Sequence, residues 1–152
     1  MSPSLATPAF PDDDGSTDPA LAAAFAADDR EVVVAALAGA RVFVPVVALL
    51  GDVPAEGDKN AEMAAVLMTG ADGRQALLTF SSVATMAAWD PQARPVPVLG
   101  ADAARAALSE LASALLLDVG SASFVVVETT DVEHLAAGHR LVRTAAGTAW
   151  VA

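Results

Sequence analysis

The clearest pattern of apolar and polar positions lies in the middle of the chain, at residues 63–80. Two short apolar runs, 66–68 and 77–80, flank the polar dipeptide Asp72-Gly73. Asp-Gly is a favoured hairpin turn because glycine adopts a positive φ without steric cost. Short apolar runs bounded by such a turn are typical of buried strands. The pattern therefore predicts a β-hairpin whose two strands contribute to the core.

The stretch that follows, residues 83–89, carries apolar residues at helical spacing. Ser81 and Ser82 come immediately before it, and serine hydroxyls accept hydrogen bonds from the first N–H groups of a helix. Asp90-Pro91 comes after it, and the residue before a proline is disfavoured in the helical conformation. We therefore predict a helix that begins after Ser82 and ends at Trp89.

The same reasoning gives the other elements. Helices are predicted at 20–27, 30–38, 102–114 and 131–137, with Asp18, Asp28-Asp29, Asp102 and Asp131 as their N-caps. Strands are predicted at 41–50, 96–99, 115–118 and 123–128, and a second hairpin at 140–143 and 148–151. Pro45 has no N–H group, which places its strand at a sheet edge or at a bulge. Strands interleaved with helices predict an α/β (α+β) fold: a single domain with a mixed β-sheet and helices packed on it.

The domain organisation follows from where apolar periodicity begins. Residues 1–17 lack it and are rich in proline, serine and aspartate, so they are predicted to be a disordered N-terminal tail. Residues 18–152 form the domain, which is long enough to bury a substantial core. Residues 51–60 are acidic and polar and are predicted to be a flexible loop.

Composition excludes several classes of function. The formal net charge is −11, from 19 acidic and 8 basic residues. Nucleic-acid binding requires a basic patch, so we expect no nucleic-acid partner. The same charge opposes adsorption on anionic membranes, and no apolar run reaches the roughly 18 residues of a transmembrane helix, so no membrane contact is expected. The absence of cysteine excludes disulfides and thiolate chemistry and suits a cytoplasmic location.

Residues able to support catalysis or bind a metal are sparse. His134 and His139 are the only histidines, and the neighbouring sequence does not supply the further ligands that a metal site needs. Because their spacing crosses Gly138, we do not expect the two imidazoles on one helix face. Ser81 and Ser82 lack the flanking glycines of a nucleophile elbow, so helix capping is their expected role. We therefore assign no catalytic residue, no metal and no cofactor.

Three motifs occur in a recognisable order: Asp72-Gly73-Arg74, the run Leu-Leu-Thr-Phe-Ser-Ser at 77–82, and Trp89. Together with the segments 36–46 and 115–118, they resemble the SseB N-terminal domain family. Members of that family typically show a strand, a turn of the Asp-Gly-Arg type, a strand ending in Phe-Thr-Ser and a helix ending in Trp. Ser81 stands where the family usually has threonine, which keeps the hydroxyl. The resemblance spans roughly residues 18–138, implies a bacterial protein with this fold, and brings no catalytic residue with it.

The first functional interpretation is a non-catalytic protein-interaction module. Its candidate contact residues are Trp89, Asp90, Pro91 and Arg74, because tryptophan is enriched at interface hot spots and Arg74 lies at a hairpin tip. Trp89 is also a candidate core residue, since a tryptophan is usually largely buried. The sequence does not identify the protein partner, and it leaves a homodimer open.

The alternative is a small-molecule-binding or enzymatic α/β domain. Its pocket would lie near Arg74 and Ser81 and would be completed by a carboxylate such as Asp118 or Glu128. These residues follow or precede predicted strands, and open α/β sheets bind ligands at strand ends.

Overall fold

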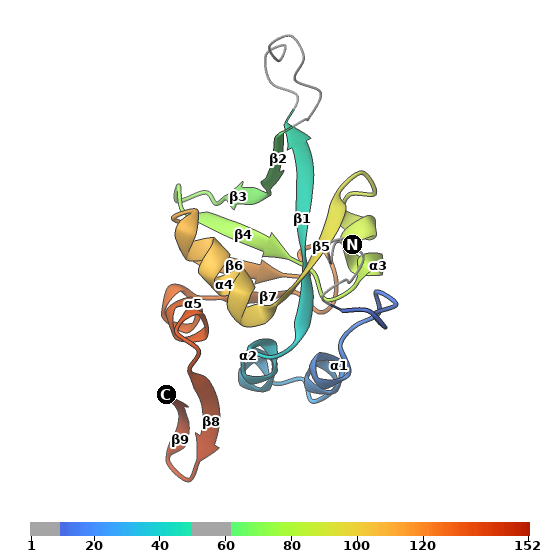
Figure 1. The fold of residues 1–152 in the computed structure, drawn as a ribbon. Coiled ribbons are helices and arrows are strands. Elements are labelled where there is room, and N and C mark those ends of the chain that lie inside the picture. Colours follow the sequence, from blue (N-terminus) through green and yellow to red (C-terminus); the bar gives the residue numbers. More distant parts are fainter. Residues whose placement is uncertain (1–9, 50–61) are drawn as a thin grey trace, which may run out of the picture.

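The computed structural model describes residues 10–49 and 62–152. Over these residues the chain forms an α+β domain with five helices and nine strands (Figure 1), which confirms the predicted fold class. The strands form a three-stranded sheet, a four-stranded sheet and a separate two-stranded hairpin. The predicted loop at 51–60 lies outside the described residues.

The three-stranded sheet has the order β2-β1-β5. Its strands are β1 (Arg41–Leu49), β2 (Glu62–Ala65) and β5 (Arg94–Leu99), and both pairings are antiparallel. Of the two positions predicted for Pro45, a sheet edge or a bulge, the edge is wrong, because β1 is the middle strand. Pro45 is tolerated because the pairing with β2 begins only at the next residue, Val46, so no ladder hydrogen bond is lost there.

The four-stranded sheet has the order β3-β4-β6-β7. It contains β3 (Leu67–Thr69), β4 (Gln75–Thr79), β6 (Ala114–Leu117) and β7 (Val125–Val127). β3 and β4 form the predicted antiparallel hairpin, and Gly73 in its turn has a φ of 84°. β4 and β6 are parallel, so their carboxyl ends lie side by side.

The two sheets join along β1 and β4. Phe43 and Phe80 exchange two backbone hydrogen bonds of 2.8 Å, and the chain passes directly from β2 to β3 through Val66. The junction therefore holds the sheets in a fixed relation through backbone contacts.

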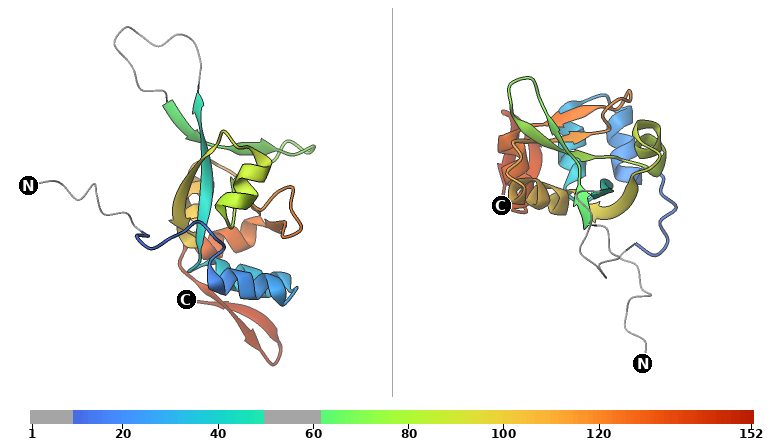
Figure 2. Two further views of the ribbon diagram at one scale, coloured as in Figure 1. Left: turned by 90° about the vertical axis from the view of Figure 1, so that its right-hand side faces the viewer. Right: turned by 90° about the horizontal axis from the view of Figure 1, so that it is seen from above.

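Two apolar cores lie on opposite sides of these sheets. In Figure 2 helices flank the sheets on both sides. The main core packs against four helices: α1 (Pro19–Ala26), α2 (Arg30–Leu37), α4 (Gly100–Ser109) and α5 (Thr129–Ala136). The smaller core, here called the α3 core, packs against α3 (Val83–Trp89) and contains Phe43, Leu78, Phe80, Met86 and Ala93. β1 contributes to both, since Val42 and Val44 belong to the main core and Phe43 to the α3 core.

Local capping signals are confirmed at three helix starts. Asp18, Asp29 and Ser82 are the N-caps of α1, α2 and α3, and each side chain accepts a hydrogen bond from a backbone N–H of the first turn. Asp90 ends α3 as predicted. These ends could be predicted because the capping residue and its partner are neighbours in sequence.

The predicted N-caps of the last two helices are wrong. α4 begins at Gly100 and α5 at Thr129, so Asp102 and Asp131 lie in the first turns and not at the caps. At α4 the Gly100 N–H donates to the Ala40 carbonyl at 2.9 Å and the Ala101 N–H to the Ala38 carbonyl at 3.2 Å. The chain after α2 therefore satisfies these N–H groups, and no capping side chain is needed.

Gly100 permits this close approach. A Cβ atom at this position would lie 1.8 Å from the Leu37 carbonyl oxygen, inside the contact distance of any pair of atoms. α4 also ends earlier than the predicted residue 114, at Ser109, because Leu111 turns the chain with a φ of 60°.

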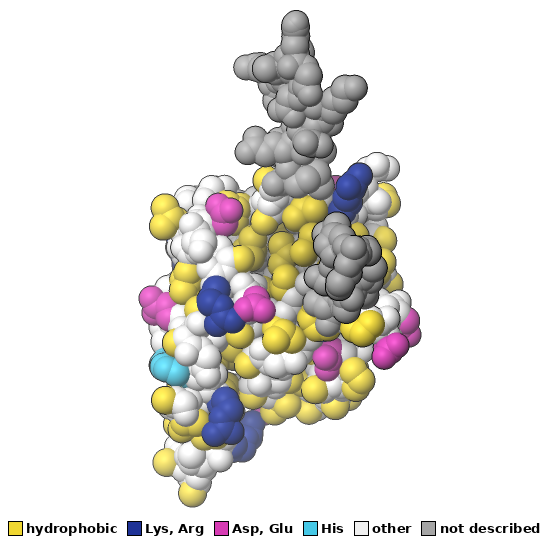
Figure 3. All heavy atoms as spheres, viewed as in Figure 1, with side chains coloured by type: hydrophobic (Ala, Val, Ile, Leu, Met, Phe, Trp, Pro, Cys, Tyr) yellow, Lys and Arg dark blue, Asp and Glu magenta, His cyan; other side chains and the backbone are white. Residues whose placement is uncertain are grey.

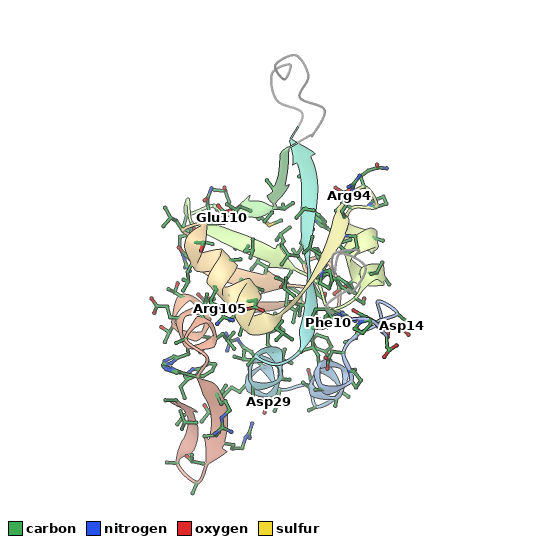
Figure 4. The ribbon with its side chains drawn as sticks, in the orientation of Figure 1. Phe10, Asp14, Asp29, Arg94, Arg105 and Glu110 are labelled. Carbon is green, nitrogen blue, oxygen red and sulfur yellow. The ribbon has the colours of Figure 1, made fainter. Side chains whose placement is uncertain are left out.

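Residues 10–17, the part of the predicted tail that the structure describes, lie against the domain. Asp13 forms an ion pair with Arg41 at 2.7 Å, and the Gly15 carbonyl accepts a hydrogen bond from the Val83 N–H at 2.9 Å. Figure 4 shows Phe10 and Asp14 beside β1 and α1. Residues 1–9 lie outside the described residues.

The predicted C-terminal hairpin is confirmed as β8 (Arg140–Thr144) and β9 (Gly147–Val151). It extends below α2 and α5 in Figure 1, away from the two larger sheets. Within the described residues, no helix combines the length and the apolar composition needed to cross a bilayer.

Candidate functional site

A cluster of buried polar side chains lies at the carboxyl ends of β4 and β6. Asp118 follows β6 directly, is fully buried and has a φ of 58°. Ser81 follows β4 by two residues and is also buried. The Ser81 hydroxyl donates to Asp118 Oδ2 at 2.5 Å and the Ser81 N–H donates to Oδ1 at 2.7 Å. The parallel pairing of β4 and β6 brings these two residues together across 37 positions of sequence.

Two more hydroxyls complete this Asp118 junction. Ser123 Oγ donates to Oδ2 at 2.6 Å, and Thr85 Oγ1 lies 3.0 Å from Oδ1. Thr85 also forms the capping box of α3 with Ser82. No buried side-chain nitrogen or oxygen of the described residues lacks a hydrogen-bond partner. The junction therefore fastens the start of α3 to the loop after β6, and the Ser81 hydroxyl is inaccessible to a substrate.

Arg41 extends this junction towards the N-terminus. Its buried guanidinium donates to the Ser81 carbonyl at 3.0 Å and to Asp13 Oδ1 at 2.8 Å, and it lies 4.1 Å from the centroid of the Phe43 ring. Sequence reasoning missed this residue. The only available signal was a charged residue at the start of an otherwise apolar strand, a pattern that also fits a solvated strand end.

The structure does not bring Arg74 and Ser81 into one pocket. The two residues flank β4 and lie at opposite ends of that strand. Arg74 is half-exposed in the β3–β4 turn, 3.4 Å from Glu128 and 3.9 Å from Asp72. Ser81 contacts Asp118 in the interior. The alternative pocket near Arg74 and Ser81 is therefore wrong, although its pairing of Ser81 with Asp118 is observed.

Trp89 packs on the α3 core, one of the two roles considered for it. Its ring is half-buried and packs on Phe80 in the α3 core, with the ring centroids 5.5 Å apart. The next two residues lead away from the helix: the Asp90 carboxylate accepts from the Gln92 N–H at 2.8 Å, and Pro91 is exposed. One part of the Trp89 ring is therefore fixed by the core, and the rest is accessible beside an exposed turn.

β5, which follows this turn, exposes apolar side chains along most of its length. Val96 is 39% exposed and Leu99 38%, and Pro95 and Pro97 are exposed as well. Side chains alternate along a strand, so Pro95, Pro97 and Leu99 lie on the face that carries Phe43, and Val96 lies on the opposite face with Val44. We call these four side chains, which together cover both faces of this edge strand, the β5 surface. Figure 3 shows hydrophobic side chains gathered over the region of β1, which pairs with β5, and Figure 4 shows Arg94 directed outward at the start of β5.

The backbone of β5 cannot accept a further strand at its prolines. The N–H and C=O of Phe43 point away from β5, because they bond to Phe80. Phe43 lies opposite Pro97, and Pro45 lies opposite Pro95. In such antiparallel pairs the backbone groups of both residues point away from each other, so those of Pro95 and Pro97 face the free edge. That edge lacks two of the N–H groups that an added strand would need.

A groove of about 740 Å³ lies between the α1–α2 corner and β7. Phe25, buried Val33 and Phe124, which is 44% exposed, supply apolar surface, while Asp28, Arg30 and Glu128 supply charge. We call it the β7 groove. Sequence reasoning did not find it, because its residues come from two segments about 100 positions apart that only the fold brings together.

The two histidines meet although, as predicted, they do not share a helix face, since α5 ends at Ala136. His134 Nδ1 and His139 Nδ1 are 2.8 Å apart, because Gly138, with a φ of 81°, reverses the chain after α5 and the His139 N–H bonds to the His134 carbonyl. Both rings are half-buried, and His134 stacks on Trp150 with centroids 4.9 Å apart. Among the described residues, no group of three or more histidine, aspartate or glutamate side chains could hold a metal ion.

The C-terminal hairpin is fastened at two points. Trp150 Nε1 donates to Asp131 Oδ1 at 3.1 Å, and Arg143 donates to Asp29 Oδ2 at 2.7 Å. The hydrogen bond from Arg143 is the main reason why the pKa of Asp29 lies below its usual range.

Comparison with known proteins gives one match. The model of the SseB protein N-terminal domain matches residues 18–134, which is more than two thirds of the chain. No curated protein and no solved structure matches the chain. The matched segment contains the Asp118 junction, the β5 surface and the β7 groove, and it ends before the C-terminal hairpin.

Proposed function

Because the chain belongs to the SseB N-terminal domain family, we propose that it works as a non-catalytic protein-interaction module that docks through the β5 surface. The polar residues with the most reactive chemistry support the non-catalytic part. Ser81 and Asp118 are buried and hydrogen-bonded to each other, and the two histidines contact each other beside the C-terminal hairpin, where His134 stacks on Trp150.

The observation that carries the proposal is the exposure of apolar side chains on β5. Single exposed apolar residues are common on any protein surface, but here Pro95, Val96, Pro97 and Leu99 follow one another on one strand. Pro91 and the accessible part of Trp89 lie just before them, which extends the apolar surface towards α3.

The chemistry of the edge indicates how a partner would bind. Because Pro95 and Pro97 remove two N–H groups from the free edge, strand addition is disfavoured. A partner would instead pack its own apolar side chains around this edge strand, against Val96 on one face and against Pro95 and Pro97 on the other, with Trp89 as an anchor on the α3 side.

Net charge argues for a different protein over a second copy. At a formal charge of −11, two copies of this chain repel each other on approach. We therefore expect a partner with an apolar contact surface and an excess of lysine and arginine around it.

The test uses two lysine substitutions at similarly exposed apolar positions. Val96→Lys places a cation in the β5 surface, and Met68→Lys does the same on β3, where Met68 is 37% exposed. Wild type and both variants are immobilised and exposed to a native lysate of the source cells, and the captured protein is then purified and titrated against each. We expect the wild type and Met68→Lys to bind it in equal stoichiometry and Val96→Lys to lose about 30-fold in affinity, the scale of a hot spot.

Three results would contradict the proposal. Equal affinity of Val96→Lys and wild type would exclude the β5 surface. Sedimentation showing a dimer that Val96→Lys disrupts would replace the different partner by a second copy. A metabolite that stabilises the protein by about 2.7 kcal/mol at 100 times its dissociation constant would favour a ligand-binding or enzymatic domain.

A further inference from the structure

We propose that the β7 groove binds an extended, basic segment of a protein chain, at a site separate from the β5 surface. At about 740 Å³ the groove is larger than the hollow of about 490 Å³ beside Arg41, and its volume is that of typical ligand sites. Its apolar surface comes from Phe25, Val33 and Phe124. Phe124 is exposed although it is a large aromatic residue next to a core strand, and an apolar side chain of the bound segment would cover it.

The edge of the sheet supplies the hydrogen bonds for an extended segment. β7 is the last strand of its sheet, and the Val126 carbonyl accepts a hydrogen bond of 2.9 Å from Arg30, which lies across the groove. This carbonyl therefore points away from β6, and in an antiparallel pair the N–H of the same residue points the same way. Val126 thus directs one N–H and one C=O to this edge, the pair of groups through which an extended peptide joins a sheet, and a bound segment would share or replace the hydrogen bond that Arg30 donates to the C=O.

The charges around the groove favour a basic segment. Asp29 is paired with Arg143, Glu128 with Arg74, and Arg30 with Asp131. Among the described residues, Asp28 has no ion-pair partner, although it is exposed at the same rim with a φ of 52°. A lysine or arginine of the bound segment would pair with it, and the overall charge of −11 attracts such a segment.

The wall of the groove is held in place before binding. Ser123 lines the groove and donates a hydrogen bond of 2.6 Å to the buried Asp118 carboxylate. The loop that carries Phe124 is thereby fixed to the Asp118 junction, which lowers the entropy lost when a ligand binds.

The test starts from a phage-displayed library of random linear peptides, selected on the immobilised protein. We expect enriched peptides that combine an apolar side chain with lysine or arginine, and micromolar binding of the synthetic peptides in fluorescence anisotropy. Phe124→Ser and Asp28→Lys should each weaken this binding about tenfold or more, because each removes one of the proposed contacts. Val96→Lys is the control and should bind the peptides as the wild type does.

The proposed backbone hydrogen bonds between the peptide and Val126 are tested by a separate measurement. N-methylation of the peptide amide that pairs with Val126 should weaken binding about tenfold, and hydrogen exchange of the wild-type protein should show protection of β7 and not of β5 when the peptide is bound. This measurement needs no protein variant, so it remains informative even if a substitution disturbs folding.

The proposal is overturned if no peptide is enriched, if the enriched peptides are acidic, or if they bind Phe124→Ser and Asp28→Lys as tightly as wild type. Loss of binding in Val96→Lys together with protection of β5 would also overturn it and would assign the peptides to the β5 surface. Its failure leaves the proposed function untouched, because partner capture through β5 is measured with the Val96→Lys and Met68→Lys variants.

Discussion

Replacement of Asp118 tests whether the junction at the carboxyl ends of β4 and β6 holds the fold together. The buried carboxylate accepts hydrogen bonds from the Ser81 N–H and from the hydroxyls of Ser81, Ser123 and Thr85. In Asp118→Ala the Thr85 hydroxyl can turn to the Ser82 carbonyl at 3.0 Å, but the buried Ser81 N–H cannot move. The substitution therefore leaves at least one backbone donor without an acceptor.

The magnitude follows from these groups. A buried amide N–H left without an acceptor lowers the free energy of unfolding by about 1–3 kcal/mol, and the loss of the hydrogen bonds from hydroxyls to a charged acceptor lowers it further by about 1–2 kcal/mol. Alanine at the φ of 58° adds about 1 kcal/mol of backbone strain. We therefore expect Asp118→Ala to lower the free energy of unfolding by about 3–6 kcal/mol, a large part of the stability of an ordinary domain.

Two further substitutions separate these contributions. Asp118→Gly loses the same hydrogen bonds but accepts the positive φ, so it should be about 1 kcal/mol more stable than Asp118→Ala. Asp118→Asn keeps one acceptor oxygen for the Ser81 N–H and tolerates the left-handed conformation, so its loss should be about 1–2 kcal/mol.

Urea unfolding followed by tryptophan fluorescence and circular dichroism measures all four proteins. The expected order of stability is wild type, Asn, Gly, Ala. A midpoint of Asp118→Ala within error of wild type would refute the reasoning, and equal midpoints for Asn and Ala would show that the retained acceptor has no effect.

Four more predictions concern other parts of the fold. Gly100→Ala should lower the free energy of unfolding by about 3 kcal/mol or more, because the added Cβ would lie 1.8 Å from the Leu37 carbonyl oxygen. Urea unfolding measures this loss. Trp89→Ala should cost about 2–3 kcal/mol, less than a fully buried tryptophan, and Trp89→Phe less than that, both measured by urea unfolding. Arg41→Met removes the ion pair with residue 13 and should make residues 10–17 sensitive to limited proteolysis. The pKa of Asp29 is lowered in the folded state, so the contact between Asp29 and Arg143 stabilises the hairpin fully above the ordinary pKa of aspartate. This stabilisation is lost as the pH falls through the lowered pKa, and hydrogen exchange of β8 and β9 should then become faster. Asp29→Asn should show the same faster exchange at neutral pH.

Each of these has a contradicting outcome. An unchanged midpoint for Gly100→Ala would mean that α4 shifts away from α2 at little cost. A wild-type midpoint for Trp89→Ala would place that side chain outside the α3 core. Equal protease resistance of wild type and Arg41→Met would show that other contacts hold residues 10–17, and pH-independent exchange in β8 and β9 would show that Asp29 does not hold the hairpin.

The features predicted correctly from the sequence are those set by neighbouring residues. The Asp72-Gly73 turn, the Ser82 cap and the stop at Asp90-Pro91 all act within a few positions. Hydrophobic spacing supplied the strands and helices between them, and the order of motifs supplied the family, which the matched model confirms.

The features that were missed depend on contacts between distant segments. The start of α4 is set by carbonyls of residues 38 and 40, which no local pattern around Asp102 reveals. The meeting of His134 and His139 depends on a reversal at Gly138 that spacing alone does not describe. The β7 groove exists only because the fold brings Phe25 next to Phe124.

The position of β1 has a consequence for how this domain comes apart. Val42 and Val44 face one core and Phe43 faces the other, so β1 contributes one side of each core. Water cannot enter either core by displacement of β1 without exposing the other, so the two cores are expected to melt in one cooperative transition. In native-state hydrogen exchange, the Phe43 and Phe80 amides that join the sheets should then exchange only through global unfolding, while the hairpin of β8 and β9 opens on its own.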